Sequence, residues 1–162
     1  MVLRLAEAKA RTGAARSNTR REPAIVIGAD TVVDLDGEAL GKPGSALVAA
    51  EMLRKLSGKT HRVLTGLALA RLPGGDTRVE LETTQVRFVP LSEEEIARYV
   101  ATDEPLDKAG AYAIQGAAGR FVERIDGCYF NVVGLPLARL YRMLKQMGWQ
   151  PGEEKENEKG GQ

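Results

Sequence analysis

The sequence has few cysteines, few aromatic residues and no long apolar run. Its single cysteine, Cys128, cannot form an internal disulfide, and it lacks the companion thiolates that a cysteine zinc site requires. This cysteine usage favours a reducing compartment, so we expect a cytoplasmic protein. No apolar stretch approaches the ~20 residues of a membrane-spanning helix, and residues 1–9 are too charged for a signal peptide. We therefore expect no membrane partner.

The charge balance and the length of the chain limit its possible partners and its number of domains. The 23 basic and 22 acidic residues nearly cancel, which leaves no positive surplus for a nucleic-acid surface, and we expect no nucleic-acid partner. With 162 residues, 43% of them hydrophobic, the chain can bury one sizeable core but is short for two domains. We predict a single domain over residues 1–149. Residues 150–162 have no apolar side chain and predict a disordered tail.

The most apolar stretch of the chain is followed by an ionisable residue. Residues 24–29 are typical of a strand that is buried on both faces and paired along both edges. Asp30 comes directly after them. A carboxylate at the end of a buried strand costs several kcal/mol unless a cation, a metal or hydrogen-bond donors compensate it. Asp30 therefore indicates either a functional site or a turn or helix cap, and this stretch alone leaves both open.

A hairpin signal follows the strand. Asp36-Gly37 is typical of a two-residue β-turn, which sends the chain back in the direction from which it came. We therefore expect Lys42 to return close to Asp30. A carboxylate and an ammonium group placed together in this way would suit a metal-bound polyphosphate.

The remaining pattern predicts further helices and hairpins. Helical spacing and capping residues predict helices over residues 3–15, 46–56, 93–101 and 136–147. β-branched segments separated by glycine-containing turns predict two hairpins, residues 61–71 with 77–89 and residues 120–125 with 128–133. His61 is the single histidine. It is interpreted as a structural hydrogen-bonding residue, with a ligand or pH-switch role as the alternative.

Several motifs in one order resemble the Maf family of nucleoside triphosphate pyrophosphatases. They are Ala29-Asp30-Thr31-Val32-Val33, Leu40-Gly41-Lys42-Pro43, Leu56-Ser57-Gly58 with His61, Val63 and Thr65-Gly66, the run from Asp107 to Gly116, and the run from Asn131 to Leu137. The resemblance covers nearly everything between residues 3 and 148. The version Ala113-Ile114-Gln115-Gly116 resembles the branch that hydrolyses dTTP and UTP.

The resemblance implies a fold and an activity. The implied fold is an α/β protein with an elongated, twisted mixed sheet, flanking helices and two lobes around a cleft, similar to inosine triphosphate pyrophosphatase. The implied activity releases nucleoside monophosphate and pyrophosphate from dTTP, UTP or modified relatives, with Mg²⁺ or Mn²⁺ as cofactor. The nucleoside triphosphate is the implied partner, and a homodimer is left open. A non-catalytic nucleotide-binding or cell-division regulatory protein and an ordinary α/β binding module stay as alternatives.

The resemblance also implies roles for charged residues. Asp30 would be the base that activates a water attacking the α-phosphorus, and it would also touch the metal. Lys9, Lys42 and Lys108 would hold phosphate oxygens. The alternative readings are a structural carboxylate and ordinary surface lysines.

Two polar residues would set the choice of base by the same resemblance. They are Thr31 and Gln115. A glutamine amide can donate and accept at once, which suits the carbonyl and imide edge of uracil or thymine. The alternative for Gln115 is a solvent-facing side chain in a glycine-bounded loop.

Members of the family carry a strand with a Ser/Arg-Arg motif before the residues that match 5–10, and this sequence does not contain it. We expect the chain as written to lack phosphate-binding arginines and to expose a strand edge. We therefore expect it to be poorly soluble or loosely folded, and to hydrolyse dTTP and UTP far more slowly than a version in which the upstream region is restored.

Overall fold

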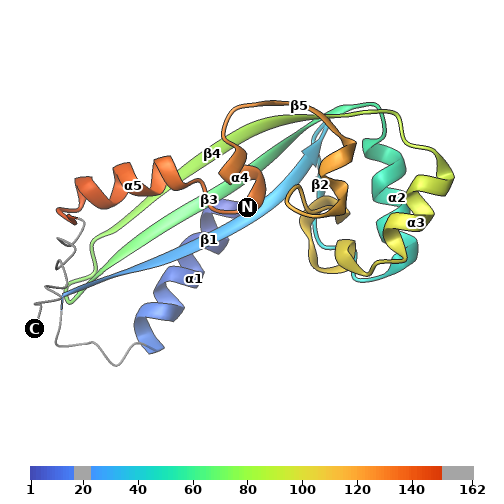
Figure 1. Ribbon diagram of the computed structural model, residues 1–162. Helices are drawn as coiled ribbons and strands as arrows, with labels where there is room; N and C mark the ends of the chain where they lie inside the picture. Colours follow the sequence, from blue (N-terminus) through green and yellow to red (C-terminus); the bar gives the residue numbers. More distant parts are fainter. Residues whose placement is uncertain (17–22, 151–162) are drawn as a thin grey trace, which may run out of the picture.

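Three long antiparallel strands run along the molecule. The structure is a computed structural model that describes residues 1–16 and 23–150, so the predicted tail lies outside it apart from Gln150. The long strands are β1 (Ala24–Leu35), β3 (Thr60–Leu72) and β4 (Thr77–Phe88), and the short strands are β2 (Glu38–Leu40) and β5 (Val122–Asp126). They form one elongated sheet in the order β2-β1-β3-β4-β5 (Figure 1).

The α/β class and the elongated sheet are confirmed, but the described strands form no mixed sheet. All four of their pairings are antiparallel. Tight hairpins join β1 to β2 and β3 to β4, and such turns require neighbouring strands to run in opposite directions. In the first hairpin Asp36 and Gly37 have φ of 52° and 90°, as the predicted turn requires.

Helices cover both faces of the sheet and build a lobe at one end (Figure 1). The α-helices are α1 (Val2–Arg16), α2 (Ala46–Leu56), α3 (Glu93–Val100), α4 (Tyr129–Val133) and α5 (Leu137–Gln146), and the 3₁₀ turns are η1 (Glu104–Asp107), η2 (Ala109–Ala111) and η3 (Ala117–Phe121). All four predicted helices are confirmed. Among the described helices, none has the length and apolar character needed to cross a bilayer.

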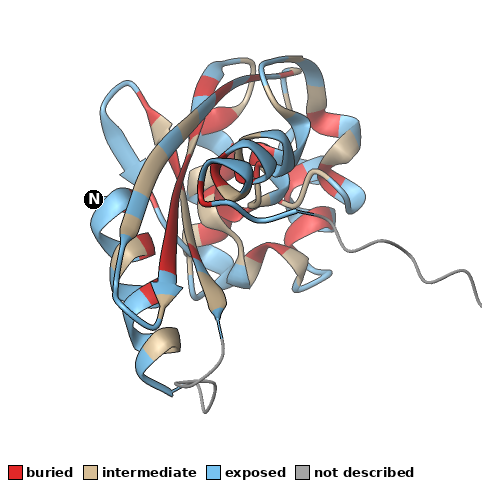
Figure 2. Ribbon diagram, turned by 90° about the vertical axis from the view of Figure 1, so that its left-hand side faces the viewer, coloured by how far each residue is buried: buried red, intermediate tan, exposed pale blue. Residues whose placement is uncertain are grey.

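Within residues 1–16 and 23–150 the buried side chains form three separate cores. The largest lies in the lobe, where the ends of β1, β3 and β4 meet α2 and α3. A second core joins α5 to Leu67 and Leu69 on one face of β3. The third joins α1 to the opposite face and consists of alanines, Ala6 and Ala10 against Ala68 and Ala70. Figure 2 shows buried segments along the strands and on the inward sides of the helices.

The strand that contains Asp30 differs from its prediction. Asp30 lies inside β1 rather than at its end, because residues 31–35 continue the strand and pair with β3 as far as Asp34. Among the described residues, β2 pairs only with Val33–Leu35, so the same edge of residues 24–32 has no strand partner. Ile27 is 44% exposed. For the described residues, the predicted burial on both faces is wrong, whereas the strand edge expected to be exposed in this chain is indeed unpaired over residues 24–32.

The second predicted hairpin is also wrong. Residues 122–126 form β5 and pair with β4, whereas residues 129–133 form helix α4. Thr84 on β4 holds the start of this helix: its hydroxyl accepts from the Cys128 N–H at 3.0 Å and donates to the Cys128 carbonyl at 3.1 Å. The chain after Gly127 is thus attached to a side chain of β4 and turns into a helix instead of returning along β5.

Helix α1 packs unusually close to the sheet. A Cβ atom at Gly28 would overlap the Ala6 carbonyl oxygen, and one at Gly66 would lie 2.7 Å from the Val2 carbonyl oxygen. Both glycines project towards α1, where the alanine core also lies. The helix backbone therefore rests directly on β1 and β3, which only residues without a side chain permit.

Replacing Gly28 by alanine tests this contact. Gly28→Ala should destabilise the protein by about 1 to 3 kcal/mol, the usual cost of forcing a methyl group into a filled site. Gly41→Ala is the control, because nothing lies within 4 Å of a Cβ at that position. Urea unfolding of both variants measures the difference. Equal stability of the two would show that α1 does not need the glycine.

Candidate active site

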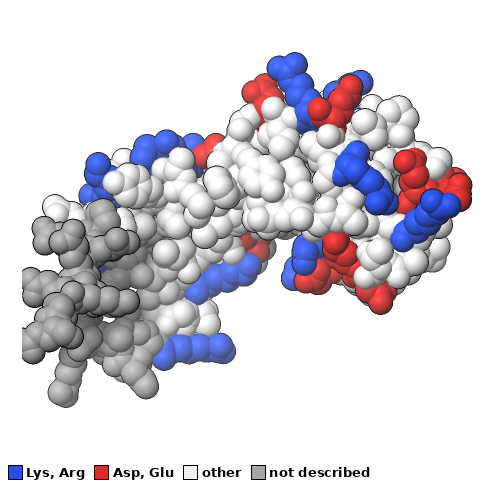
Figure 3. All heavy atoms as spheres, viewed as in Figure 1, with Lys and Arg blue, Asp and Glu red and all other residues white. Residues whose placement is uncertain are grey.

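One cavity of about 310 Å³ contains every site residue predicted from the sequence. It lies beside residues 29–33 of β1, where the sheet meets the lobe, and is also lined by residues of α1, α4 and the segment 107–115. The predicted residues lining it are Lys9, Asp30, Thr31, Lys42, Lys108 and Gln115. Figure 3 shows basic and acidic side chains on both sides of the indentation between the body that carries α1 and the lobe.

Asp30 is held by a lysine from the helix below it. The Lys9 ammonium donates to Asp30 Oδ1 at 2.7 Å and to the Ala29 carbonyl at 3.0 Å. The Asp30 side chain is 18% exposed and that of Lys9 is 56% exposed, so the pair borders on solvent. Among the described residues, Asp30 Oδ2 has no hydrogen-bond partner. One carboxylate oxygen is therefore fixed and the other is available to a ligand or a water.

Thr31 approaches the cavity from the other face of β1. Its Oγ1 lies 2.8 Å from Thr65 Oγ1, and the Thr65 hydroxyl donates to the Asn131 carbonyl at 3.3 Å. Because Thr65 has one hydroxyl proton and a carbonyl can only accept, Thr31 must be the donor in the threonine pair. The hydroxyl proton of Thr31 is thus used in its hydrogen bond to Thr65. Towards the cavity, Thr31 offers only lone pairs.

Asn131 fixes the wall formed by α4. It is fully buried, and its Nδ2 donates to the Val63 carbonyl at 2.9 Å and to Thr84 Oγ1 at 3.0 Å. These bonds join α4 to β3 and β4, and α4 brings Val132 and Val133 to the cavity. The sequence places Thr65 and Asn131 in motifs, but no spacing rule shows that their side chains meet.

The opposite wall carries further charges. The Lys108 ammonium donates to Asp107 at 2.6 Å, and this hydrogen bond lowers the pKa of the Asp107 carboxyl. Lys42 has no ion-pair partner among the described residues. The cavity thus contains three lysines and two aspartates, which leave a formal charge of 3 − 2 = +1. An anionic ligand would be attracted to it.

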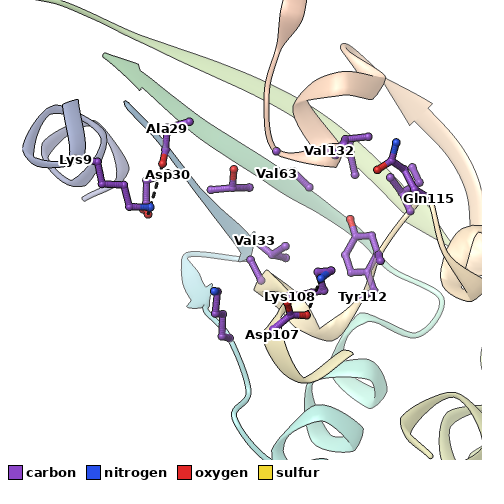
Figure 4. Close-up of a pocket in the computed structure, with 17 residues that line it drawn as sticks. Lys9, Ala29, Asp30, Val33, Val63, Asp107, Lys108, Tyr112, Gln115 and Val132 are labelled. Carbon is purple, nitrogen blue, oxygen red and sulfur yellow. Dashed lines mark hydrogen bonds and ion pairs between the residues drawn. The ribbon is translucent and has the colours of Figure 1, made fainter. Parts of the chain in front are cut away.

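Gln115 lies far from the Lys9–Asp30 pair. In Figure 4 the two are on opposite sides of the view, with Val63 and the Tyr112 ring between them. The cavity therefore has an ionic end and an end formed by apolar side chains and one amide. This division suits a ligand that joins a charged group to a neutral ring.

His61 supports this site without lining it. Its Nε2 lies 2.8 Å from the Tyr112 hydroxyl, and its ring contacts Phe88 and Tyr112 edge to face. Nδ1 has no partner among the described residues. His61 is 2% exposed, and burial lowers its pKa to about 4. The interpretation as a structural residue is confirmed.

The carboxylates of the cavity fit a metal that is shared with a ligand. No group of three or more His, Cys, Asp or Glu side chains in the described part of the chain could hold a metal alone. Mg²⁺ is commonly bound by one or two carboxylates together with substrate phosphates. Asp30, with one unpaired oxygen at the ionic end, meets that requirement.

Comparison with known proteins agrees with the geometry. A family model described as "Maf-like protein" matches residues 1–147. A "dTTP/UTP pyrophosphatase" of Symbiobacterium thermophilum is 53% identical over 149 residues, which are 92% of this chain and 74% of that protein. The protein of the same name from Escherichia coli K12 is 53% identical over 146 residues, 88% of this chain and 70% of its own length. The protein of the same name from Pelotomaculum thermopropionicum is 56% identical over 128 residues, which are 79% of this chain and 67% of that protein.

The buried histidine predicts a pH-dependent stability. The pKa of His61 is about 4 in the fold, below the ~6.5 of an unfolded histidine, so the unfolded chain binds the extra proton first. The contribution of neutral His61 to the free energy of unfolding should be fully present above about pH 6.5. The free energy of unfolding should then fall by up to about 3 kcal/mol as the pH drops to 4.

His61→Gln removes this titration and provides the comparison. The variant should be less stable at pH 7.5 but should lose less stability between pH 6.5 and 4. Urea unfolding midpoints across that range measure both curves, and carboxylate titrations are common to them. Parallel curves would contradict the prediction.

Proposed function

Because the chain belongs to the Maf-like family, we propose that it hydrolyses dTTP and UTP to the nucleoside monophosphate and pyrophosphate. The observation that carries this proposal is the single cavity that combines Asp30 and three lysines with Gln115. The relatives named as dTTP/UTP pyrophosphatases support the substrate class. A cytoplasmic location and a homodimer remain predictions.

The lysines supply the charge that binds a triphosphate. Lys9 comes from α1, Lys42 from the segment after β2, and Lys108 from the turn between η1 and η2. A triphosphate carries several negative charges, and the catalysis of phosphoryl transfer depends mainly on neutralising and positioning them. Flexible ammonium groups from three directions can surround the phosphate chain.

Asp30 is the proposed general base. Lys9 holds Oδ1, so the unpaired Oδ2 takes a proton from a water molecule. The water oxygen forms a bond to the α-phosphorus, the bond from that phosphorus to the oxygen of the β-phosphate breaks, and pyrophosphate leaves with the electron pair. General-base catalysis of this kind contributes about 10²- to 10⁴-fold.

A divalent metal is proposed as the cofactor. When bound, Mg²⁺ or Mn²⁺ would neutralise phosphate charge and polarise the phosphoryl oxygens. Asp30 would hold it together with the substrate phosphates, because it is less exposed than Asp107 and lies at the ionic end of the cavity. Lys9 and Lys42 bind and orient the phosphates from the other sides.

Thr31 and Gln115 are proposed to select the base. Uracil and thymine present an N–H donor between two carbonyl acceptors, whereas cytosine presents an amino donor beside a nitrogen acceptor. Thr31 can only accept from a ligand, and Gln115 can donate to a carbonyl and accept from an N–H. A fixed acceptor that faces N3 of the ring matches uracil and thymine, whose N3 donates, and rejects cytosine, whose N3 accepts. The Gln115 amide discriminates only when it is held in one orientation, because a turned amide would match cytosine.

Asp30→Asn tests the base. The amide keeps the shape but cannot take a proton, so turnover of dTTP and UTP should fall by about 10² to 10⁴ while binding changes only a few-fold. Asp36→Asn is the control, because Asp36 lies in the exposed hairpin turn. Pyrophosphate release measures turnover. Unchanged turnover would remove Asp30 from the mechanism, and binding without turnover in the wild type would favour the non-catalytic alternative.

Lys42→Ala tests the phosphate site. Its charge acts on the phosphates, so binding of a non-hydrolysable UTP analogue should weaken much more than binding of UMP. Calorimetry with both ligands measures the two changes, and Lys59→Ala, on the exposed turn before β3, serves as the control. An equal loss for both ligands would show that Lys42 acts elsewhere.

A further inference from the structure

The loop that presents Gln115 has little to hold it in place at its apex. Gln115 and Gly116 are exposed, and no hydrogen bond to the Gln115 side chain is found among the described residues. The Gly116 N–H donates to the Ala113 carbonyl at 3.0 Å and closes a turn. The position of the Gln115 amide in the cavity therefore depends on how the backbone from Ala113 to Ala117 is anchored.

A single carboxylate anchors both ends of this loop. Glu104 Oε2 accepts from the Ala117 N–H at 3.3 Å, and Glu104 Oε1 accepts from the Tyr99 hydroxyl at 2.8 Å. The same hydroxyl accepts from the Ala113 N–H at 3.1 Å. One end of the loop is thus bonded to Glu104 directly and the other through Tyr99. Both oxygens of the Glu104 carboxyl group therefore act as acceptors.

The anchor is itself part of a packed structure. Tyr99 is 1% exposed on α3, and its ring meets Phe121 edge to face at 5.4 Å. Burial raises the pKa of the Tyr99 hydroxyl, which therefore keeps the proton that it donates to Glu104. A Cβ at Gly116 would overlap both carboxylate oxygens of Glu104. The loop accordingly lies directly against the carboxylate, with no room for a water between them.

We propose that Glu104 and Tyr99 are positioning residues for the choice of base. They hold the loop from Ala113 to Ala117 so that the Gln115 amide meets the edge of the pyrimidine in one orientation. Discrimination by hydrogen bonds requires that a mismatched edge leaves buried groups unpaired, which happens only if the protein group cannot move to adapt. This inference rests on the proposed function, because it assigns to Glu104 and Tyr99 a part in pyrimidine recognition.

Two conservative variants test it. Tyr99→Phe removes the hydroxyl, and Glu104→Gln replaces one acceptor oxygen by an amide nitrogen that cannot accept. Each should lower the ratio of kcat/KM for UTP to that for CTP by about tenfold, because the loop can then adapt to the wrong edge. Glu104→Gln combined with Tyr99→Phe should match Glu104→Gln alone, since both residues belong to one chain of hydrogen bonds.

A combination with Gln115→Ala separates positioning from general support of the fold. If Glu104 acts through Gln115, then Glu104→Gln should leave the UTP/CTP ratio unchanged in a chain that already carries Gln115→Ala. Tyr141→Phe on α5 and Glu94→Gln on α3 are matched controls on exposed side chains and should keep the wild-type ratio. A drop in kcat/KM that is equal for all bases, in either test variant, would overturn the proposal.

The activity of the wild-type chain and hydrogen exchange in the variant also test the proposal. A wild-type chain that hydrolyses UTP and CTP equally would overturn it, because there would be no choice of base to support. A wild-type chain without any nucleotide hydrolysis would refute the proposed function instead. Hydrogen exchange at the Ala113 and Ala117 amides then tests the anchor directly. Faster exchange at both in Glu104→Gln would support it, and unchanged exchange would overturn it.

Discussion

The close contact between α1 and the sheet is the constraint on which the site depends. Gly28 and Gly66 let the helix backbone rest on β1 and β3, and the small side chains of Ala6 and Ala10 fill the remaining space. At this distance the ammonium of Lys9 reaches Asp30 and the carbonyl of the neighbouring residue on β1. A larger residue at either glycine would lift the helix and separate the proposed base from its cation. The contact of α1 with β1 and β3 therefore both packs the helix on the sheet and places Lys9 beside Asp30.

The cavity lies beside the edge of β1, and this position explains how two consecutive residues, Asp30 and Thr31, can both line it although their side chains point to opposite faces. Successive side chains of a strand point to opposite faces. Asp30 consequently joins Lys9 on the side of α1, whereas Thr31 joins Thr65 on the side of α4. A cavity on one face of a sheet would receive only one of them. Because this one borders a strand edge that β2 leaves open within the described residues, it receives both.

The two ends of the cavity use different physical means. Lysines with partly exposed, flexible side chains provide charge at the ionic end, where attraction varies slowly with distance. Reading the edge of a base needs directional hydrogen bonds, which fail within a fraction of an ångström. The residues around Gln115 are accordingly tied to the buried Tyr99 and to Glu104, and Thr31 is fixed by the chain of bonds through Thr65. The groups proposed to read the base are therefore tied to buried side chains, whereas the lysines proposed to bind phosphate stay partly exposed.

Local pattern in the sequence by itself determined most of the helices and strands, because caps, turns and periodicity act over a few residues. The Asp36-Gly37 turn forms as predicted, and the predicted helices over 46–56 and 93–101 begin with side-chain caps from Ser45 and Ser92. The residues of the site came from ordered motifs, and the structure brings them into one cavity.

Only the tertiary structure decided how strand edges are paired and which polar side chains meet. The hairpin expected over residues 120–133 does not form, and Cys128 at its centre is instead bonded to Thr84, 44 residues earlier in the chain. The bonds that anchor the loop of Gln115 join residues up to 14 positions apart, and Asn131 bonds to a carbonyl 68 positions away. Such contacts leave no periodic signal, since they depend on which distant elements the packed sheet places side by side.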